Sequence, residues 1–162
     1  MMNIRMKKIS FVFFVLLLSF LFINPLSSSA QESWWKDKKF KTDEAKLKYS
    51  LCKRTFKDIL SGFNYKNIRN IKNYFGSDVN LDIKSYERGY YSSNQAEIML
   101  LDFMDFFTIV NMKYDKAYYL NNYSFAVGKY TYDRGSGKIS LKVNIALRYV
   151  DDKWMVDQIS IN

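Results

Sequence analysis

The sequence contains no histidine and only one cysteine, Cys52. Without histidine the chain can form neither a Ser–His nor a Cys–His nucleophilic pair, and zinc sites built on nitrogen or sulfur ligands are excluded. A single cysteine cannot form an intramolecular disulfide. Cys52 falls in step with apolar neighbours at helical spacing, so we expect a buried thiol that fills space. We predict no metal site and no cofactor.

Proline is nearly absent too, and the single Pro25 ends the one long hydrophobic run of the chain, Phe11–Ile23. Basic residues precede this run, and small residues follow it up to Ala30, so we expect cleavage between Ala30 and Gln31. The run is shorter than the roughly 20 residues that span a bilayer, and we expect no stable membrane anchor after cleavage. Residues 1–30 therefore predict a signal peptide and an exported protein, periplasmic or extracellular.

Residues 31–162 retain 22 basic and 16 acidic residues, a net charge of +6. A chain of this length forms one domain with an adequate core. The basic charge suits anionic neighbours in a cell envelope or simply keeps the surface soluble, and both interpretations stay open. We expect no nucleic-acid partner, because an exported protein rarely meets one. Residues 31–42 predict a flexible leader, in which Trp34 and Trp35 dock either on the fold or on a membrane surface.

Apolar residues recur at helical spacing in three segments, which predict helices at residues 43–61, at 65–75 and from 92 onward. Thr42 caps the start of the first helix and Gly62 marks its end. Ser92 and Gln95 form a capping box at the start of the third helix. Its apolar residues cover a wide face, so we expect this helix to be deeply packed.

Alternation of apolar and polar residues predicts strands at residues 79–83, 86–91, 110–115, 123–132, 138–149 and 154–161. In the clearest strand, six apolar residues from Ile139 to Tyr149 face one way, which indicates one buried and one wetter face. The alternation changes phase near the C-terminus and predicts a bulge at Asp157-Gln158. Because the helices precede the main sheet, the fold class is α+β.

Four stretches are familiar from other proteins: Lys72–Phe75, Tyr91–Phe103, Phe125–Gly128 and Trp154–Ile159. Together they resemble the DUF4783 family of small exported bacterial proteins, which is similar to the NTF2-like superfamily. The resemblance spans about residues 50 to 162 and implies an NTF2-like (cystatin-like) cone over residues 43–162. In that fold three helices pack on a strongly bent antiparallel sheet of about four long strands plus a short hairpin. Relatives often carry a His-Lys-Gly step where this sequence has Lys116-Ala117-Tyr118, and the family's function is unassigned.

A cone of this kind offers a pocket between the sheet and the helices. The candidate lining residues are Met99, Phe103, Tyr114, Tyr130, Tyr149 and Trp154. Alternatively, these rings pack the core with their hydroxyl groups at its rim, and both interpretations stay open. If the domain is an enzyme, Asp102 is the candidate general base, although a solvated carboxylate at that position is ordinary.

The leading hypothesis is a non-catalytic exported domain that binds a small apolar ligand or a protein partner in the cell envelope. One alternative is a cofactor-free isomerase or dehydratase that uses a carboxylate or tyrosine of the cone. Another is a structural envelope component that forms a homodimer through the outer face of the sheet. On that face Lys138, Lys142 and Arg148 suit an anionic polymer or lipid head groups. A completely filled cone would exclude both the ligand pocket and the enzyme.

Overall fold

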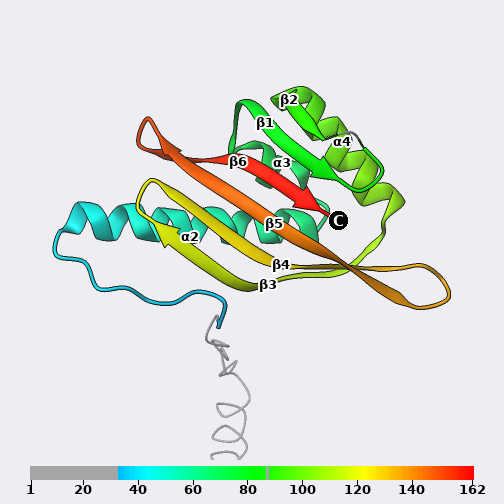
Figure 1. Ribbon diagram of the computed structural model, residues 1–162, viewed down its shortest axis with the longest axis horizontal. Helices are drawn as coiled ribbons and strands as arrows, with labels where there is room; N and C mark the ends of the chain where they lie inside the picture. Colours follow the sequence, from blue (N-terminus) through cyan, green and yellow to red (C-terminus); the bar gives the residue numbers. More distant parts are fainter. Residues whose placement is uncertain (1–32, 87) are drawn as a thin grey trace, which may run out of the picture. The chain divides into compact units, whose positions relative to one another are not determined.

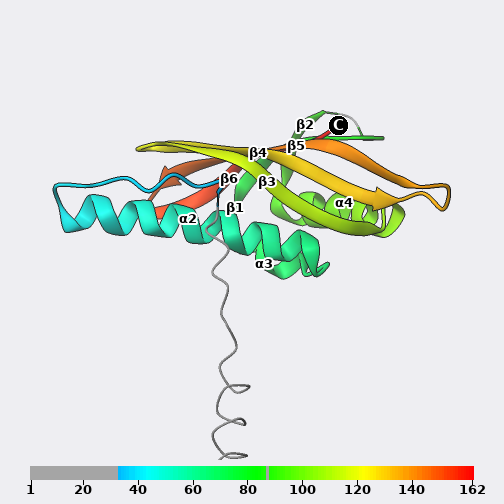
Figure 2. The same cartoon turned by 90° about the horizontal axis from the view of Figure 1, so that it is seen from below.

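The computed structural model describes residues 33–86 and 88–162 (Figure 1). The predicted signal peptide, with its cleavage site at Ala30 and Gln31, lies outside these residues. The helices are α2 (Asp43–Asn64), α3 (Ile68–Lys72) and α4 (Ser93–Phe106). The strands are β1 (Phe75–Ile83), β2 (Gly89–Ser92), β3 (Ile109–Leu120), β4 (Tyr123–Asp133), β5 (Lys138–Val150) and β6 (Lys153–Ile161). The helices lie on one face of a single sheet, which confirms the α+β class (Figure 2).

Helix α2 begins where the sequence predicts, because the Thr42 side chain accepts a hydrogen bond from the Ala45 N–H at 3.3 Å. It does not end at Gly62 but continues to Asn64. Gly62 serves a close contact instead: a Cβ at this position would lie 2.5 Å from the Ile71 side chain. The buried face of the helix is Tyr49, Cys52, Thr55, Phe56, Ile59, Gly62 and Phe63.

The second predicted helix is much shorter than expected and comprises only the five residues of α3. Phe75, at the end of the predicted helix, lies in the sheet instead, where it begins β1 and pairs with Val156 of β6. The Val156 N–H donates to the Tyr74 carbonyl at 2.7 Å. A long-range backbone pairing therefore overrides the local helical pattern at Phe75.

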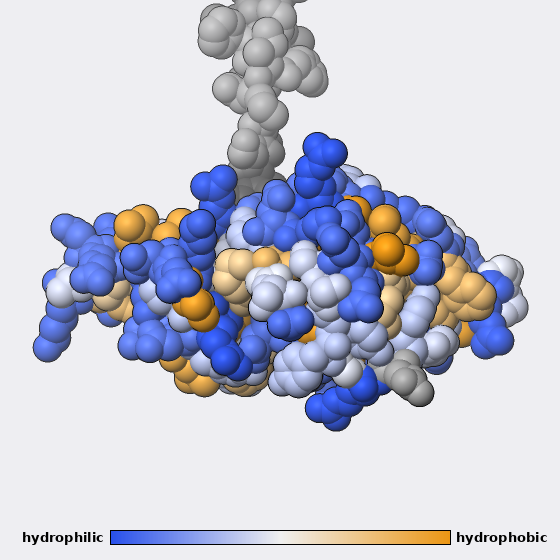
Figure 3. All heavy atoms as spheres, turned by 90° about the horizontal axis from the view of Figure 1, so that it is seen from above, coloured by the Kyte–Doolittle hydropathy of each residue, from blue (hydrophilic) through white to orange (hydrophobic). Residues whose placement is uncertain are grey.

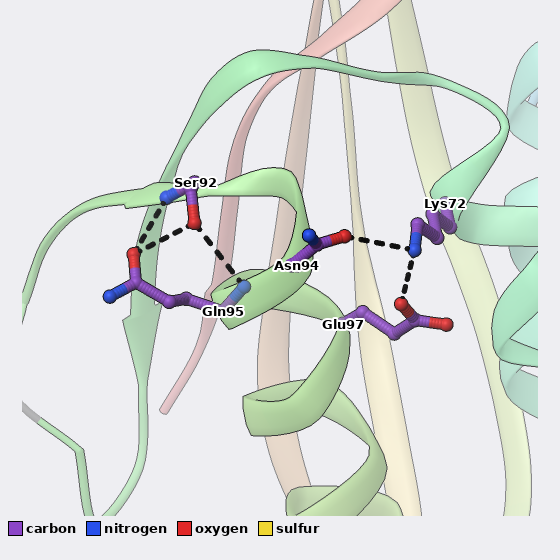
Figure 4. Close-up of polar contacts among 5 residues, drawn as sticks. All are labelled: Lys72, Ser92, Asn94, Gln95 and Glu97. Atoms are coloured by element: carbon purple, nitrogen blue, oxygen red, sulfur yellow. Dashed lines mark hydrogen bonds and ion pairs between the residues drawn. The ribbon is translucent and has the colours of Figure 1, made fainter.

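Helix α4 begins with the predicted capping box (Figure 4). The Ser92 N–H donates to the Gln95 side chain at 3.0 Å, and the Gln95 N–H donates to the Ser92 hydroxyl at 3.4 Å. Lys72 of α3 donates to Asn94 at 3.2 Å and forms an ion pair with Glu97. The start of α4 is thus fixed both by its own cap and by the end of α3.

The expected deep packing of α4 is wrong for one side of the helix. Ala96, Leu100, Phe103 and Met104 are buried, whereas Ile98 is 58% exposed and Phe106 is 80% exposed. Figure 3 views the domain from the side of β1, β2 and α4, where hydrophobic side chains lie among hydrophilic ones. The sequence pattern shows which residues of the helix are apolar, but it does not show that other elements pack against only one side of the helix.

The strand order is β2-β1-β6-β5-β4-β3. Strands β3 to β6 form the expected antiparallel meander, and β1 and β2 form the expected hairpin. The hairpin joins the same sheet through a parallel pairing of β1 with β6, which the sequence did not predict. The bulge is confirmed: Ala146 pairs with Gln158 and Leu147 with Val156, which leaves Asp157 as the extra residue.

The predicted flexible leader requires a correction over its described part. Trp34 and Trp35 are only 8% and 6% exposed and belong to the hydrophobic core. The Ala117 N–H of edge strand β3 donates to the Trp34 carbonyl at 2.8 Å. The two indole rings therefore pack on the fold rather than on a membrane surface, since their burial requires the sheet and α2.

Candidate functional site

The six predicted pocket residues do not surround one cavity. The rings of Phe103 and Tyr130 are in contact in the core, with centroids 5.1 Å apart. Tyr114 packs against Trp34 at 5.1 Å. Tyr149 contacts Trp154 at 5.2 Å near the β5–β6 turn, and Met99 is half-buried on α4. These residues lie at different places in one hydrophobic core, as expected for rings that fill the space between sheet and helices.

The buried tyrosines are poor candidates for a general base. The Tyr130 hydroxyl donates to the Phe107 carbonyl at 2.6 Å. Burial raises the pKa of Tyr130 and, more strongly, that of Tyr114. Both hydroxyl groups therefore keep their protons at neutral pH. Asp102 is exposed on α4, so it lacks the buried setting that the proposed base role assumes.

A surface hollow of about 250 Å³ lies where the segment before α2 crosses edge strand β3. We call it the edge-strand hollow. Its aromatic residues are Trp35, Tyr49, Tyr118 and Tyr119, and its cationic residues are Lys36, Lys38 and Lys116. The lining combines the segment before α2 and Tyr49 of α2 with a distant part of the sequence, residues 116–120 of β3.

The aromatic floor of the edge-strand hollow is held by several contacts. Tyr49 contacts Trp35 at 5.1 Å and Tyr119 at 5.0 Å between ring centroids. The Tyr49 hydroxyl donates to the Lys36 carbonyl. Burial and then the negative charge of Asp37 raise the pKa of Tyr49, against a smaller lowering by the Trp35 N–H. The floor is therefore uncharged at neutral pH and largely apolar.

Three ammonium groups stand around this floor. Lys38 donates to the Tyr119 carbonyl at 2.9 Å and lies 5.4 Å from the centre of the Tyr119 ring. Lys116 lies 4.6 Å from the centre of the Tyr118 ring, a cation–π distance. The lining contains no acidic residue, and the nearby Asp37 is paired with Lys53 at 4.0 Å. The hollow is thus aromatic inside and positive at its rim.

A second hollow of about 230 Å³ is bordered by Trp154, Tyr74 and Arg54. The Tyr74 hydroxyl donates to Asp58 at 2.5 Å, and Arg54 lies 3.8 Å from the same carboxylate. Burial, followed by the hydrogen bond to Asp58, raises the pKa of Tyr74 to about 12. Tyr74 therefore acts as a proton donor in a structural contact and not as a base at neutral pH.

The edge-strand hollow is missed by the sequence analysis, although two signals point toward it. The tryptophan pair stands out in a polar segment, and Lys116-Ala117-Tyr118, where we expected a departure from related sequences, lines the hollow. Among residues 33–86 and 88–162, no cluster of three acidic or cysteine side chains is arranged to hold a metal ion. No helix in this part of the chain is long and apolar enough to cross a bilayer.

Comparison with known proteins identifies a family and a fold. The family described as a domain of unknown function, DUF4783, matches residues 56–162. A DUF4783 protein from Bacteroides uniformis is 20% identical, with a TM-score of 0.59, and the match covers 65% of this chain and 94% of that one. A protein of unknown function with a cystatin-like fold from Nostoc punctiforme is 14% identical, with a TM-score of 0.53 and coverage of 71% and 90%.

A protein described as an NTF2 type with a long sheet is 10% identical, with a TM-score of 0.58 and coverage of 68% and 98%. At these identities the solved structures establish the fold alone, and the expected NTF2-like (cystatin-like) architecture is confirmed. None of the curated proteins matches the chain.

Proposed function

The chain belongs to the DUF4783 family, and we propose that it is an exported, non-catalytic NTF2-like domain that binds a small anionic amphiphile in the edge-strand hollow. The family has no assigned activity, so the proposal rests on the chemistry of the hollow. The ligand would place an apolar body on the aromatic floor and an anionic head group among the three lysines.

The observation that carries this proposal is the combination of an aromatic floor with three cations and no acid in one lining. The aromatic side chains favour a flat or flexible apolar body, and the ammonium groups favour a carboxylate, phosphate or sulfate. The volume of about 250 Å³ is slightly below the roughly 300–1,000 Å³ typical of drug-sized ligands, which favours a small one.

The enzyme alternative has less support. Asp102 is exposed on α4, and burial raises the pKa of Tyr114 and Tyr130. A ligand inside the cone is also disfavoured, because Phe103 and Tyr130 fill the space between the helices and the sheet.

Export is supported by the sequence of residues 1–30, with its basic start, apolar run and small residues before Gln31. The direct test is N-terminal sequencing of the protein recovered from its own host. Recovery from the envelope or medium with Gln31 first supports the proposal. An intact N-terminus in the cytoplasmic fraction would contradict it.

Ligand binding is tested by titrating residues 31–162 with decyl phosphate, decanol and inorganic phosphate while following heat and tryptophan fluorescence. We expect decyl phosphate to bind more tightly than either of the others. The double variant Lys36→Gln/Lys116→Gln should weaken binding about tenfold, because each exposed ion pair contributes up to about 1 kcal/mol.

The matched control is Lys39→Gln/Lys41→Gln, which removes the same charge from exposed positions of the neighbouring chain segment. Equal affinity of the two double variants, or equal binding of decanol and decyl phosphate, would refute the assignment. Native mass spectrometry of protein purified from its host then identifies any retained ligand.

A further inference from the structure

The outer face of the sheet is the face without helices (Figure 2). Three exposed lysines form a row across this face. The strand register pairs Lys113 of β3 with Lys129 of β4, and Lys129 with Lys142 of β5. Directly paired residues on adjacent strands point to the same side, and strands lie about 4.8 Å apart. The backbone positions of the three lysines therefore span about 10 Å across the sheet. We call these three residues the lysine row.

The lysine row has no ion-pair partner in the described part of the chain. All three side chains are exposed, and within residues 33–86 and 88–162 none of them forms an ion pair or a side-chain hydrogen bond. Arg148, farther along the same face, is paired with Asp157 at 2.7 Å, which neutralises that acid. Like charges placed directly opposite each other destabilise a sheet. Solubility alone does not require three lysines at directly paired positions, so we look for a binding role for the row.

Apolar side chains lie on the same face, a few residues further along the strands. Tyr118 and Phe125 are a cross-strand pair whose rings stack at 4.6 Å. In the next outward-facing row Leu120 pairs with Tyr123, and Leu120 is 58% exposed. Ala146 lies beside Phe125 and is almost completely covered by its neighbours. The face therefore has a cationic row and an adjoining aromatic and aliphatic surface.

We propose that this outer face docks reversibly on an anionic lipid bilayer. Lysines near a membrane surface are attracted to anionic head groups, while tyrosine and exposed aliphatic side chains settle at the head-group level. A linear soluble polyanion would engage the lysines but has no use for the aromatic and aliphatic surface. A homodimer through the whole face would bring the unpaired lysines of two copies into a buried interface.

The proposal does not require a ligand in the edge-strand hollow: the lining of the hollow contains none of the three lysines, although it shares Tyr118 and Leu120 with the outer face. It is tested with residues 31–162 by co-sedimentation with vesicles of phosphatidylcholine alone and with roughly 30% phosphatidylglycerol. We expect binding to the anionic vesicles only, and release at about 0.5 M salt. The triple variant Lys113→Gln/Lys129→Gln/Lys142→Gln should bind roughly 100-fold more weakly.

The control triple variant Lys39→Gln/Lys41→Gln/Lys46→Gln removes the same charge outside the outer face and should bind like the parent. The lysine-row variant loses only like-charge repulsion and should stay folded, which circular dichroism verifies. Equal binding of the two triple variants would overturn the proposal. So would binding to soluble polyphosphate without binding to vesicles, which would identify a polyanion as the partner.

Discussion

The side-chain amide of Asn64, at the end of α2, hydrogen-bonds both backbone groups of Met112 on edge strand β3. The Met112 N–H donates to Asn64 Oδ1 at 2.7 Å, and Asn64 Nδ2 donates to the Met112 carbonyl at 2.9 Å. At Met112, the Asn64 amide thus makes the two backbone hydrogen bonds that a further strand would make at this edge of the sheet. It also fixes the end of α2 against β3 and depends on the helix continuing past Gly62.

Replacing Asn64 with alanine should lower the free energy of unfolding by about 1–3 kcal/mol, because the paired backbone groups lose their partners. Asn64→Asp should also destabilise, since a carboxylate cannot donate to the Met112 carbonyl. Urea unfolding measures both effects. Asn111→Ala is the control: it lies on the same strand, is exposed and should change stability by less than about 0.5 kcal/mol. Equal losses in the two alanine variants would contradict the role given to Asn64.

Gly128 of β4 permits a close approach of β3. A Cβ there would lie 2.1 Å from the Lys113 carbonyl oxygen and 2.8 Å from Tyr114 Cα. Both atoms are backbone and cannot rotate away, so Gly128→Ala should cost at least about 3 kcal/mol or prevent folding. The matched control is Gly76→Ala, where the nearest atom would be 3.9 Å away. Similar thermal unfolding of both variants would disprove this packing argument.

The two tryptophans before α2 should contribute to stability as core residues. Trp34→Ala and Trp35→Ala should each cost about 3–5 kcal/mol, the range for a buried aromatic residue. Phe106→Ala, at a side chain that is 80% exposed, should cost much less. Chemical denaturation compares the three variants. If Trp35→Ala were about as stable as Phe106→Ala, the core role of Trp35 would be contradicted, and residues 31–42 would be better described as a flexible leader.

Stability should decline in alkaline solution. Burial raises the pKa of Cys52 from its ordinary 9.0 to about 12, despite a lowering by Ser124. Between pH 9.0 and about pH 12, the Cys52 thiol loses its proton in the unfolded protein but keeps it in the folded protein. The unfolded state is therefore increasingly favoured as the pH rises through this range. Below pH 9 the full stability is present. Urea unfolding at a series of pH values should show the decline, and it should be smaller in Cys52→Ala.

Local features of the fold were predictable from the sequence. The Ser92–Gln95 capping box and the bulge at Asp157 depend on neighbouring residues and on side-chain periodicity, and both are present in the structure. The role of Gly62 and the parallel pairing of Phe75 with Val156 depend on contacts with distant segments. A local pattern carries no information on such contacts, so the end of α2 and the length of α3 were mispredicted.

The candidate site was less predictable than the fold for the same reason. Its lining joins Trp35, Tyr49 and Tyr119, which become neighbours only when the segment before α2 folds back along β3. The abundance of tyrosine suggested an internal pocket. Composition alone cannot distinguish rings that line a space from rings that fill it, and Tyr114 and Tyr130 fill it.

The contacts along β3 have a consequence for self-association. An open sheet edge is a template on which other chains add as strands. Here the outward backbone groups of Met112 are occupied by Asn64, the N–H of Ala117 by Trp34, and the carbonyl of Tyr119 by Lys38. Proteolytic removal of the segment before α2, which carries Trp34 and Lys38, would remove two of these three sets of hydrogen bonds. The truncated protein would then be prone to form fibrils or amorphous aggregates by strand addition at that edge.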